Sequence, residues 1–262
     1  MPSPNRPTLC IGVLTLNEAH QIERCLKSAQ FADQVIVVDS GSTDGTVELA
    51  SRMGAQVHHY PDWQGFGPQR TRLLQHVQAD YVFFLDADEV ISPTLRDELL
   101  DVVSKNANVV GKIRWNTFAF GKELRHFVNR SSLERFFKVD NLERYEGAVH
   151  EHAVLKIADA HRFVFRAKLD HHTRQTVKGS LEKLTQYAML GASKRAQRGK
   201  RGGVLRGLLS STVVFFRLYV LRLGFTGGGA GFLLCWFVAL EFFFRYAALH
   251  YDRETLSGSV KR

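Results

Sequence analysis

Short apolar runs alternate with stretches of helical periodicity between Leu9 and Val103. An unbroken apolar run predicts a strand of a parallel sheet, because such a strand is buried on both faces. Apolar positions spaced three and four residues apart predict helices with one buried face. The expected strands are 9–14, 34–39, 56–60 and 81–85, and the expected helices are 22–29, 47–53, one through Leu73 and Val77, and one from Pro93 to Val103. This alternation predicts an α/β fold with a mostly parallel sheet flanked by helices.

The pattern changes after Gly111. The stretch 112–118 alternates between apolar and polar residues, which predicts a strand with one exposed face. Two further strands are expected within 129–139 and 161–168, and a helix with one apolar face is expected over 180–192. A basic, glycine-containing linker is predicted at 194–203, before a tail rich in phenylalanine.

The positive charge of the chain is concentrated in this tail. Residues 1–193 hold 23 Lys and Arg and 23 Asp and Glu, whereas residues 194–262 hold 12 Lys and Arg and 3 Asp and Glu, which accounts for the whole net charge of +9. Such an asymmetry indicates an anionic partner, either a nucleic acid or a membrane surface. The apolar runs 213–216, 232–240 and 242–244 are unusual for a nucleic-acid-binding tail. An anionic membrane surface is therefore favoured, and no nucleic acid is expected.

The tail is expected to form amphipathic helices that lie on the membrane. Its longest apolar stretch, 230–249, is interrupted by Glu241 and Arg245, which disfavours a helix that spans the bilayer. The apolar segments are flanked by Arg206, Arg217 and Arg222. This arrangement is typical of helices that lie in the lipid interface. The alternative is that the same segments pack against the rest of the chain or form a dimer.

Three carboxylates follow the fourth expected strand at once: Asp86, Asp88 and Glu89. In open α/β sheets, ligands bind in the crevice beyond the carboxyl ends of the strands. Closely spaced carboxylates repel one another unless a cation neutralises them. A turn after the strand can bring Asp86 and Asp88 to one divalent ion, and oxygen ligands of this kind suit Mg²⁺ or Mn²⁺. The alternative is an acidic loop without a metal.

Another carboxylate, Asp39, ends the second expected strand. At such a position it can accept hydrogen bonds from a uracil imide or a ribose hydroxyl. The loop 40–46 that follows contains small residues, which let a ligand approach the backbone. Its glycines lack the spacing of the dinucleotide-binding fingerprint, which disfavours a dehydrogenase, and a P-loop is also absent from the sequence.

Three motifs at the ends of the expected strands carry a family resemblance. They are Thr15-Leu16-Asn17-Glu18, the stretch 38–46, and Leu85-Asp86-Ala87-Asp88-Glu89. Together they resemble the nucleotide-sugar half of family 2 glycosyltransferases with the GT-A fold. Longer matches at 63–70, 145–151, His171 and 217–225 resemble lipopolysaccharide core-biosynthesis glucosyltransferases of the WaaE/KdtX type.

The resemblance implies a Rossmann-like GT-A catalytic domain over 1–193, with a donor half at about 8–110 and an acceptor half at about 111–193, followed by the helical tail 194–262. It implies an inverting, metal-dependent transfer of a hexose from a UDP-sugar, typically UDP-glucose. The implied acceptor is a heptose in the inner core of lipid A-core. The implied location is the cytoplasmic face of the bacterial inner membrane, where the protein is peripheral.

The resemblance also implies roles for individual residues. Glu151 is the expected base that takes the proton of the acceptor hydroxyl, and a surface glutamate is the alternative. The expected donor-binding residues are Thr15, Asn17, Glu18, Asp39, Ser42, Arg70 and Asp86. For Asn17 a helix-capping role, and for Arg70 a solvated helix charge, are the alternatives. Asp86 and Asp88 are expected at the metal, with His171 completing its shell and His150 as the second choice.

Two other functions remain open. One keeps the fold and the donor but has a different acceptor, which is polyprenyl phosphate, another surface polysaccharide or a protein. A polyprenyl-phosphate transferase is expected to have spanning helices. The other is a non-catalytic membrane adaptor that binds a nucleotide sugar. Such an adaptor does not need Asp86, Asp88, Glu151 and His171 together.

Overall fold

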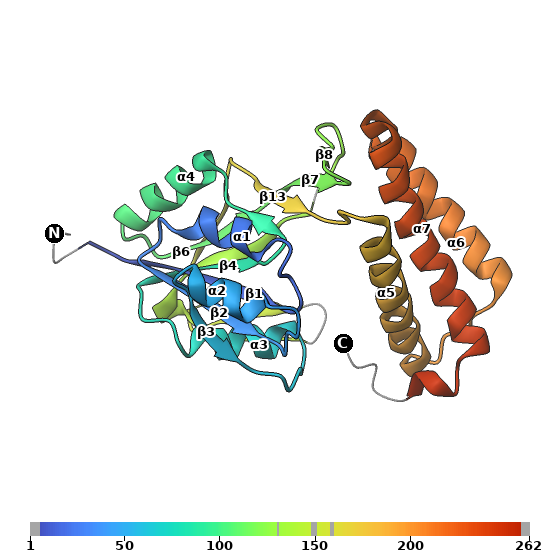
Figure 1. Cartoon of the computed structure of the whole chain (residues 1–262), viewed down its shortest axis with the longest axis horizontal. Helices are drawn as coiled ribbons and strands as arrows, with labels where there is room; N and C mark the ends of the chain where they lie inside the picture. The colour runs from blue at the N-terminus through green and yellow to red at the C-terminus, as the bar shows by residue number, and fades with distance from the viewer. Residues whose placement is uncertain (1–5, 130, 148–150, 158–159, 258–262) are drawn as a thin grey trace. The chain divides into compact units, whose positions relative to one another are not determined.

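The computed structural model describes residues 6–129, 131–147, 151–157 and 160–257. Figure 1 shows its elements along the chain. The strands are β1 Leu9–Thr15, β2 Gln34–Asp39, β3 Gln56–His59, β4 Tyr81–Asp86, β5 Glu89–Val90, β6 Val109–Ile113, β7 Trp115–Ala119, β8 Lys122–Glu123, β9 Leu133–Lys138, β10 Leu142–Glu146, β11 His152–Leu155, β12 His161–Val164 and β13 Leu169–His172. The helices are α1 Ile22–Ala29, α2 Thr46–Arg52, α3 Phe66–Leu74, α4 Pro93–Ser104, α5 Val177–Gln197, α6 Val204–Phe216 and α7 Gly228–Tyr251, with the short turns η1 Val139–Asn141, η2 Arg217–Leu221, η3 Gly224–Gly227 and η4 Thr255–Ser257.

The chain forms two compact units. Unit 1 contains residues 1–115 and 130–171, and unit 2 contains residues 116–129 and 172–262. This division differs from the boundary expected after residue 193, because α5 packs along α7 and shares a core with it. The linker expected at 194–203 also begins later, since α5 continues through Gln197.

Unit 1 is built on a seven-stranded sheet with the order β12-β6-β9-β4-β1-β2-β3. Strands β4, β1, β2 and β3 are parallel, whereas β9 is antiparallel to both of its neighbours, β4 and β6. The mostly parallel α/β sheet predicted from the sequence is therefore confirmed. A second sheet has the order β5-β13-β7-β8. The single strand expected over 112–118 is divided into β6 and β7.

The two faces of the large sheet have separate cores. One core contains the apolar side chains of α1, α2 and α4, and the other contains those of α3. Helix α4 begins as its sequence predicts, because the Ser92 hydroxyl accepts a hydrogen bond from the Leu95 amide at 3.2 Å and Pro93 occupies the first helical position. Helix α3 approaches β1 closely at Gly12, where a Cβ atom would lie 2.4 Å from the Leu73 side chain.

The strand register brings three polar residues to one edge of the sheet. Thr15 pairs with Asp39 between β1 and β2, and Leu14 pairs with Asp86 between β1 and β4. Paired residues share a face, and successive residues alternate. Asp86 therefore lies on the α3 face of the sheet, while Thr15 and Asp39 lie on the opposite face.

Unit 2 consists of α5, α6 and α7 together with the 116–129 segment that carries β8 (Figure 1). Leu124 and Ala119 pack against Leu234 of α7, and Ala192 of α5 packs against Ala248 and Leu249. Two helical stretches, 204–221 and 224–251, are long and apolar enough to cross a membrane by length and composition. In the sequence, Glu241 and Arg245 disfavour such a span. In the structure, Glu241 is buried in an ion pair with Arg174 inside the unit, so its charge is compensated there.

Candidate functional site

The loops after β1 and β2 are tied together at the edge of the sheet. Asn17 has a left-handed backbone (φ 55°), and its side-chain oxygen accepts a hydrogen bond from the Thr43 amide at 2.8 Å. The Asn17 amide in turn donates to the Ser42 hydroxyl at 2.8 Å, and the Glu18 amide donates to the Thr46 hydroxyl at 2.9 Å. Asn17 therefore links two loops. It does not cap α1, whose N-cap is Gln21.

Asp39 shapes the second of these loops. Its carboxylate accepts hydrogen bonds from the amides of Gly41 at 2.9 Å and Ser42 at 3.0 Å, from the Ser42 hydroxyl, and contacts His59 Nδ1 at 2.8 Å. The Asp39 side chain is fully buried. Both carboxylate oxygens are therefore bound by groups of the protein itself. Nearby, the buried Thr15 hydroxyl has no hydrogen-bond partner among the described residues.

Asp86 lies between two buried arginines. Arg70 Nη2 is 2.9 Å from Asp86 Oδ1, and Arg135 Nη2 is 2.7 Å from Asp86 Oδ2. Burial alone would raise the pKa of Asp86, but the two guanidinium charges outweigh it and hold the pKa well below its usual range. The carboxylate is therefore ionised and held in a fixed position. The same contacts make Arg70 a buried ion-pair partner, not the solvated helix charge that was the alternative.

A second buried acid, Glu89, supports the turn that follows β4. It accepts hydrogen bonds from the Asp86 amide at 2.8 Å and from the Trp115 indole at 2.6 Å. Burial, and then the charge of Asp86, raise the pKa of Glu89 to about 7. Arg135 lies 4.0 Å from Glu89 and opposes this shift. Glu89 thus fixes the backbone from which Asp86 and Asp88 project.

Asp88 and His171 come together from distant parts of the sequence. Strand β13 pairs antiparallel with β5 so that His171 lies opposite Glu89, and this register places His171 Nε2 3.3 Å from Asp88 Oδ2. A carboxylate and an imidazole are suitable ligands for a divalent ion. Within the described residues no group of three or more His, Cys, Asp or Glu side chains is arranged to hold a metal. His150 lies outside the described residues.

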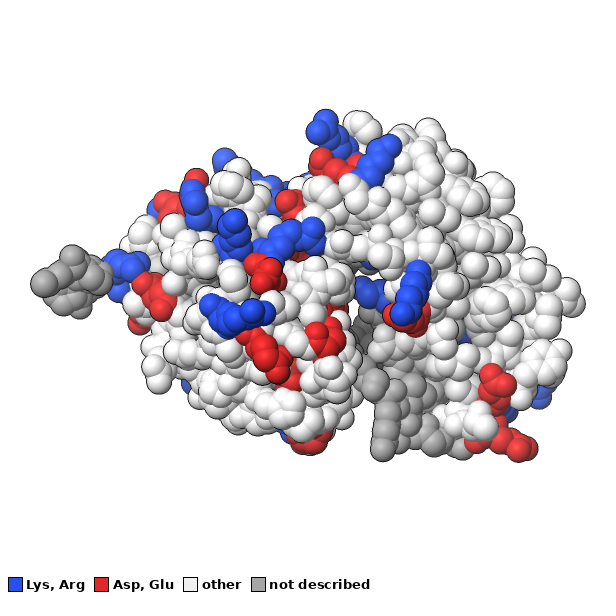
Figure 2. All heavy atoms as spheres, in the orientation of Figure 1, with Lys and Arg blue, Asp and Glu red and all other residues white. Residues whose placement is uncertain are grey.

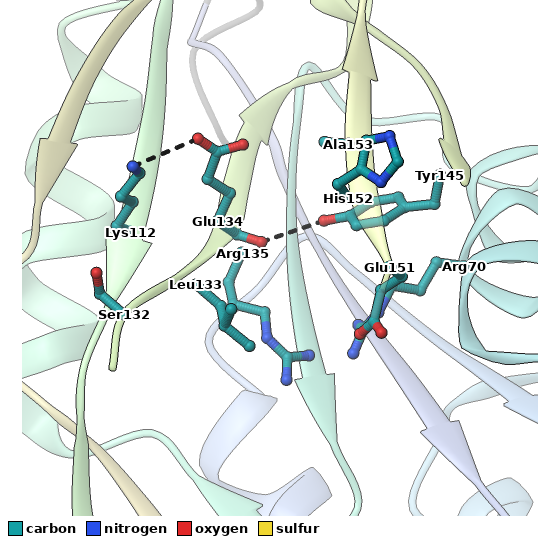
Figure 3. A pocket seen from close by; sticks show the side chains of 10 residues that line it. All are labelled: Arg70, Lys112, Ser132, Leu133, Glu134, Arg135, Tyr145, Glu151, His152 and Ala153. Carbon is teal, nitrogen blue, oxygen red and sulfur yellow. Dashed lines mark hydrogen bonds and ion pairs between the residues drawn. The ribbon is translucent and has the colours of Figure 1, made fainter. Parts of the chain in front are cut away.

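Glu151 lines a cavity of about 290 Å³ on the α3 side of the sheet. Figure 3 shows its carboxylate beside Arg70, and Arg70 Nε lies 3.5 Å from Glu151 Oε1. The cavity is lined by Arg70, Lys112, Ser132, Leu133, Glu134, Arg135, Tyr145, Glu151, His152 and Ala153. One wall is the Tyr145 ring, whose hydroxyl donates to the Glu134 carbonyl at 3.2 Å. The cavity thus combines a carboxylate with a mixed polar and apolar lining.

Contacts between α3 and the end of β10 set the distance between Arg70 and Glu151. The Gly67 amide donates to the Gly147 carbonyl at 3.1 Å, and the Tyr145 amide donates to the Thr71 hydroxyl at 2.9 Å. A Cβ atom on residue 67 would lie 2.5 Å from the Gly147 carbonyl oxygen, so only glycine permits this approach. Helix α3 therefore places Arg70 in contact with both Asp86 and Glu151.

The structure brings some predicted residues together and separates others. Arg70 contacts both Asp86 and Glu151, and Asp88 contacts His171. Asp39, Asn17 and Ser42 belong instead to the hydrogen-bonded loops at the neighbouring strand ends. Sequence reasoning missed Arg135 and Trp115, and it did not predict that Glu89 is buried and supports the turn after β4. The signal for Arg135 was a charged residue directly before the apolar pair 136–137 of a buried strand.

Several known proteins resemble this chain. The model of glycosyl transferase family 2 matches residues 10–170, which include Asp39, Asp86, Asp88 and Glu151. The lipopolysaccharide core biosynthesis glycosyltransferase LpsC of Rhizobium meliloti (strain 1021) is 25% identical over 258 residues, which cover 94% of this chain and 93% of that protein. An uncharacterized glycosyltransferase of Rickettsia bellii (strain RML369-C) is 43% identical over 88 residues, 33% of this chain and 30% of that protein.

One similar solved structure is glucosyl-3-phosphoglycerate synthase from Mycobacterium tuberculosis, in complex with Mn²⁺, uridine diphosphate and glucosyl-3-phosphoglycerate. It is 22% identical in sequence and has a TM-score of 0.40, and the match covers 52% of this chain and 58% of that chain.

Replacing Arg135 with Met should lower the free energy of unfolding by about 3 kcal/mol at pH 8, because it leaves the buried carboxylate of Glu89 and the half-buried carboxylate of Asp86 with one guanidinium fewer. The control is Arg162→Met, which removes an exposed arginine paired with Glu134 at 3.1 Å and should cost at most about 1 kcal/mol. Urea denaturation with chelator present measures both. Equal losses for the two variants would contradict the compensating role of Arg135.

The loss caused by Arg135→Met should also depend on pH. Glu89 has a folded-state pKa raised to about 7, above its unfolded value, so its ionisation destabilises the fold as pH rises. Without Arg135 this pKa rises further. In wild type the folded protein loses the Glu89 proton from about pH 7, whereas the variant holds it to higher pH, so the difference in unfolding free energy should be constant below about pH 6 and grow above about pH 7. A difference that is constant with pH would show that Arg135 does not act on Glu89.

Proposed function

Because the chain belongs to glycosyl transferase family 2 and has a GT-A-like α/β fold, we propose that it transfers a hexose, glucose in the first instance, from a UDP-sugar to a heptose of the lipopolysaccharide inner core. The acceptor class is supported by the match to a lipopolysaccharide core biosynthesis glycosyltransferase, which extends over 94% of this chain. The reaction inverts the configuration at the anomeric carbon.

The observation that carries the proposal is the convergence of strand ends at one edge of the sheet. Strands β4, β1 and β2 are adjacent and parallel, so the residues after each of them are neighbours. Ligands of open α/β sheets bind at this edge. We assign the loops with Thr15, Asn17, Glu18 and Ser42, together with Asp39, to the nucleoside of the donor. Arg70 and Asp86 belong to the diphosphate end.

Glu151 is assigned as the base. Its carboxylate lines the cavity, where an acceptor hydroxyl has room to approach, and the ion pair with Arg70 Nε fixes its direction. The acceptor oxygen forms a bond to the anomeric carbon from the side opposite the diphosphate, and the bond from that carbon to the diphosphate oxygen breaks. The hydroxyl proton moves to Glu151. Arg70 and Arg135 provide positive charge near the departing diphosphate.

A divalent ion, Mg²⁺ or Mn²⁺, is proposed as the cofactor. Asp88 and His171 lie together beyond the end of β4 with their donor atoms 3.3 Å apart, and Asp86 is the last residue of that strand. Both Asp86 oxygens already contact guanidinium groups, so we assign Asp88 and His171 as the principal ligands of the ion. Asp86 is assigned as a weaker, additional ligand. When bound, the ion neutralises charge on the diphosphate as a Lewis acid.

The acceptor is lipid-linked, and we propose that the protein acts as a peripheral protein at the cytoplasmic face of the bacterial inner membrane. We propose 1–193 as the catalytic region, with the donor half at about 8–110 and the acceptor half at about 111–193, so that its end lies within α5 of unit 2. Residues 194–262 are the membrane-associating tail. Support comes from the excess of basic residues in the tail and from its two long apolar helices.

The reaction is tested by incubating the protein with radiolabelled UDP-glucose and heptose-containing lipid A-core, with Mg²⁺ or Mn²⁺ and with chelator. We expect metal-dependent transfer of label to the lipid. Metal-dependent hydrolysis of UDP-glucose without transfer would overturn the acceptor and retain the donor. Binding of UDP-glucose without either reaction would favour the non-catalytic adaptor.

Replacing Glu151 with Gln removes the proton acceptor and should lower kcat by roughly 10²- to 10⁴-fold while the affinity for UDP stays near that of wild type. The control is Glu143→Gln, which changes an exposed glutamate of β10 that pairs with Arg144 and should leave the rate unchanged. Steady-state transfer assays and UDP titrations measure both effects. A Glu151→Gln rate within twofold of wild type would remove Glu151 as the base.

Replacing Asp88 with Asn should raise the metal concentration needed for half-maximal activity by tenfold or more, because it removes an anionic ligand. Asp97→Asn, at an exposed residue of α4 paired with Arg96, is the matched control and should not change the metal requirement. Calorimetric titration of Mn²⁺ into the protein with UDP provides a readout that is independent of turnover. Wild-type metal affinity in Asp88→Asn would overturn the assignment of this ligand.

A further inference from the structure

Helix α6 exposes its apolar residues instead of burying them. Leu205 is 77% exposed, Leu209 69%, Val213 66% and Phe216 58%, whereas the buried residues of the helix are Gly207 and Val214. The exposed four are spaced at intervals of four, four and three residues, so they form one stripe along the helix. A surface helix of a globular protein turns such a stripe toward the core. In α6 the stripe faces outward.

Helix α7 extends this outward apolar surface. Phe232 is 41% exposed and Trp236 is 45% exposed, and the Phe215 ring of α6 lies 5.7 Å from the rings of both. We call Leu205, Leu209, Val213, Phe216, Phe232 and Trp236 the apolar face. The visible surface over α6 and α7 in Figure 2 carries few charged side chains. Exposed apolar side chains of this kind on two packed helices mark an interaction site.

The charges around the apolar face favour anionic lipid as its occupant. Arg206 and Arg217 are exposed on α6 and η2, and residues 194–262 hold 12 basic residues against 3 acidic ones. A cavity of about 350 Å³ is lined by Lys122, Arg125, His126, Thr226 and Gly227, and by Glu123, whose carboxylate pairs with Arg125 at 3.1 Å. A second copy of this chain would bring the same basic groups against one another. An anionic bilayer offers hydrocarbon and negative charge together.

The inner side of α7 determines how the helices meet the bilayer. Helix α5 packs along α7 through Ala192, Ala248 and Leu249, and Gly191 allows the Arg245 side chain to lie against it. Helix α5 carries the charged residues Lys178, Glu182, Lys183, Lys194 and Arg195. If α7 crossed the bilayer, α5 would be drawn into the hydrocarbon with these charges, which is strongly unfavourable.

We propose that unit 2 binds an anionic membrane with α6 and the outward side of α7 lying in the plane of the lipid interface, so that the apolar face enters the acyl region and α5 stays in water. The proposal rests on the membrane association proposed above and specifies the surface and its orientation. It is independent of the identity of the donor and the acceptor.

The depth of Trp236 tests the orientation. The full-length protein is mixed with vesicles of phosphatidylcholine and phosphatidylglycerol whose acyl chains carry bromine either near the headgroup or near the chain end. The part of the tryptophan fluorescence that is lost in Trp236→Phe reports this side chain. The remaining tryptophans, Trp63 and Trp115, lie in unit 1. We expect stronger quenching by the shallow bromine. Stronger quenching by the deep bromine would overturn the in-plane orientation.

Variants of the apolar face test the surface itself. Leu209→Glu and Val213→Glu should each weaken vesicle binding at least tenfold, because each variant lacks an apolar side chain that is transferred from water into lipid when the wild type binds. The matched control is Leu181→Glu on α5, where the leucine is 52% exposed, and its binding should change less than twofold. Arg217→Gln should weaken binding about fivefold with phosphatidylglycerol and not at all with phosphatidylcholine alone. Equal losses for Leu181→Glu and Leu209→Glu would overturn the assignment.

Two further measurements separate this proposal from the proposed function. The rate of transfer to a deacylated, soluble core oligosaccharide should be the same in wild type and in Leu209→Glu. If that acceptor is inactive, the rates of UDP-glucose hydrolysis by the two proteins are compared instead. Light scattering gives the mass of the protein in the absence of lipid. A dimer that Leu209→Glu dissociates, together with wild-type vesicle binding by that variant, would show that the apolar face joins two copies and would overturn the membrane proposal.

Discussion

The carboxylate of Asp86, held between the guanidinium groups of Arg70 and Arg135, is the interaction around which the site is organised. Each arginine comes from a different element, α3 or β9, and each contacts a further acid, Glu151 or Glu89. Removing one charge from such a buried set leaves its partners uncompensated, and this makes the set cooperative. The carboxylate at the end of β4 thereby fixes a helix, a strand and the cavity wall relative to one another.

The sequence predicted the fold of residues 9–103 well, because parallel strands buried on both faces appear as apolar runs that amphipathic helices separate. The strands that end at Asp39 and Asp86 and the cap of α4 at Ser92 could be located from such local signals. Arg135 could not be, because its role depends on β9 entering the sheet antiparallel between β4 and β6. That pairing joins residues far apart in the chain, and no local pattern encodes it.

The site residues show the same division between local and distant signals. Asp86 and Asp88 stand out as acids directly after an apolar run, whereas the proximity of His171 to Asp88 follows from the pairing of β13 with β5. Asn17 and Asp39 were expected to contact a ligand. In the structure their oxygen atoms hold the two strand-end loops in place, and such contacts can organise a binding loop before the ligand arrives.

In the tail, the charged residues seen in the sequence and their positions in the fold lead to different expectations about membrane insertion. The charge of Glu241 disfavoured insertion into lipid when it was considered alone, but the fold neutralises it with Arg174. The charges that bear on orientation lie instead on α5, which is polar in sequence and becomes relevant only because it packs along α7. A helix hairpin that is apolar outside and covered by a charged helix inside fits the orientation that we propose at a lipid surface, in which the hairpin lies in the interface and its charged cover stays in water.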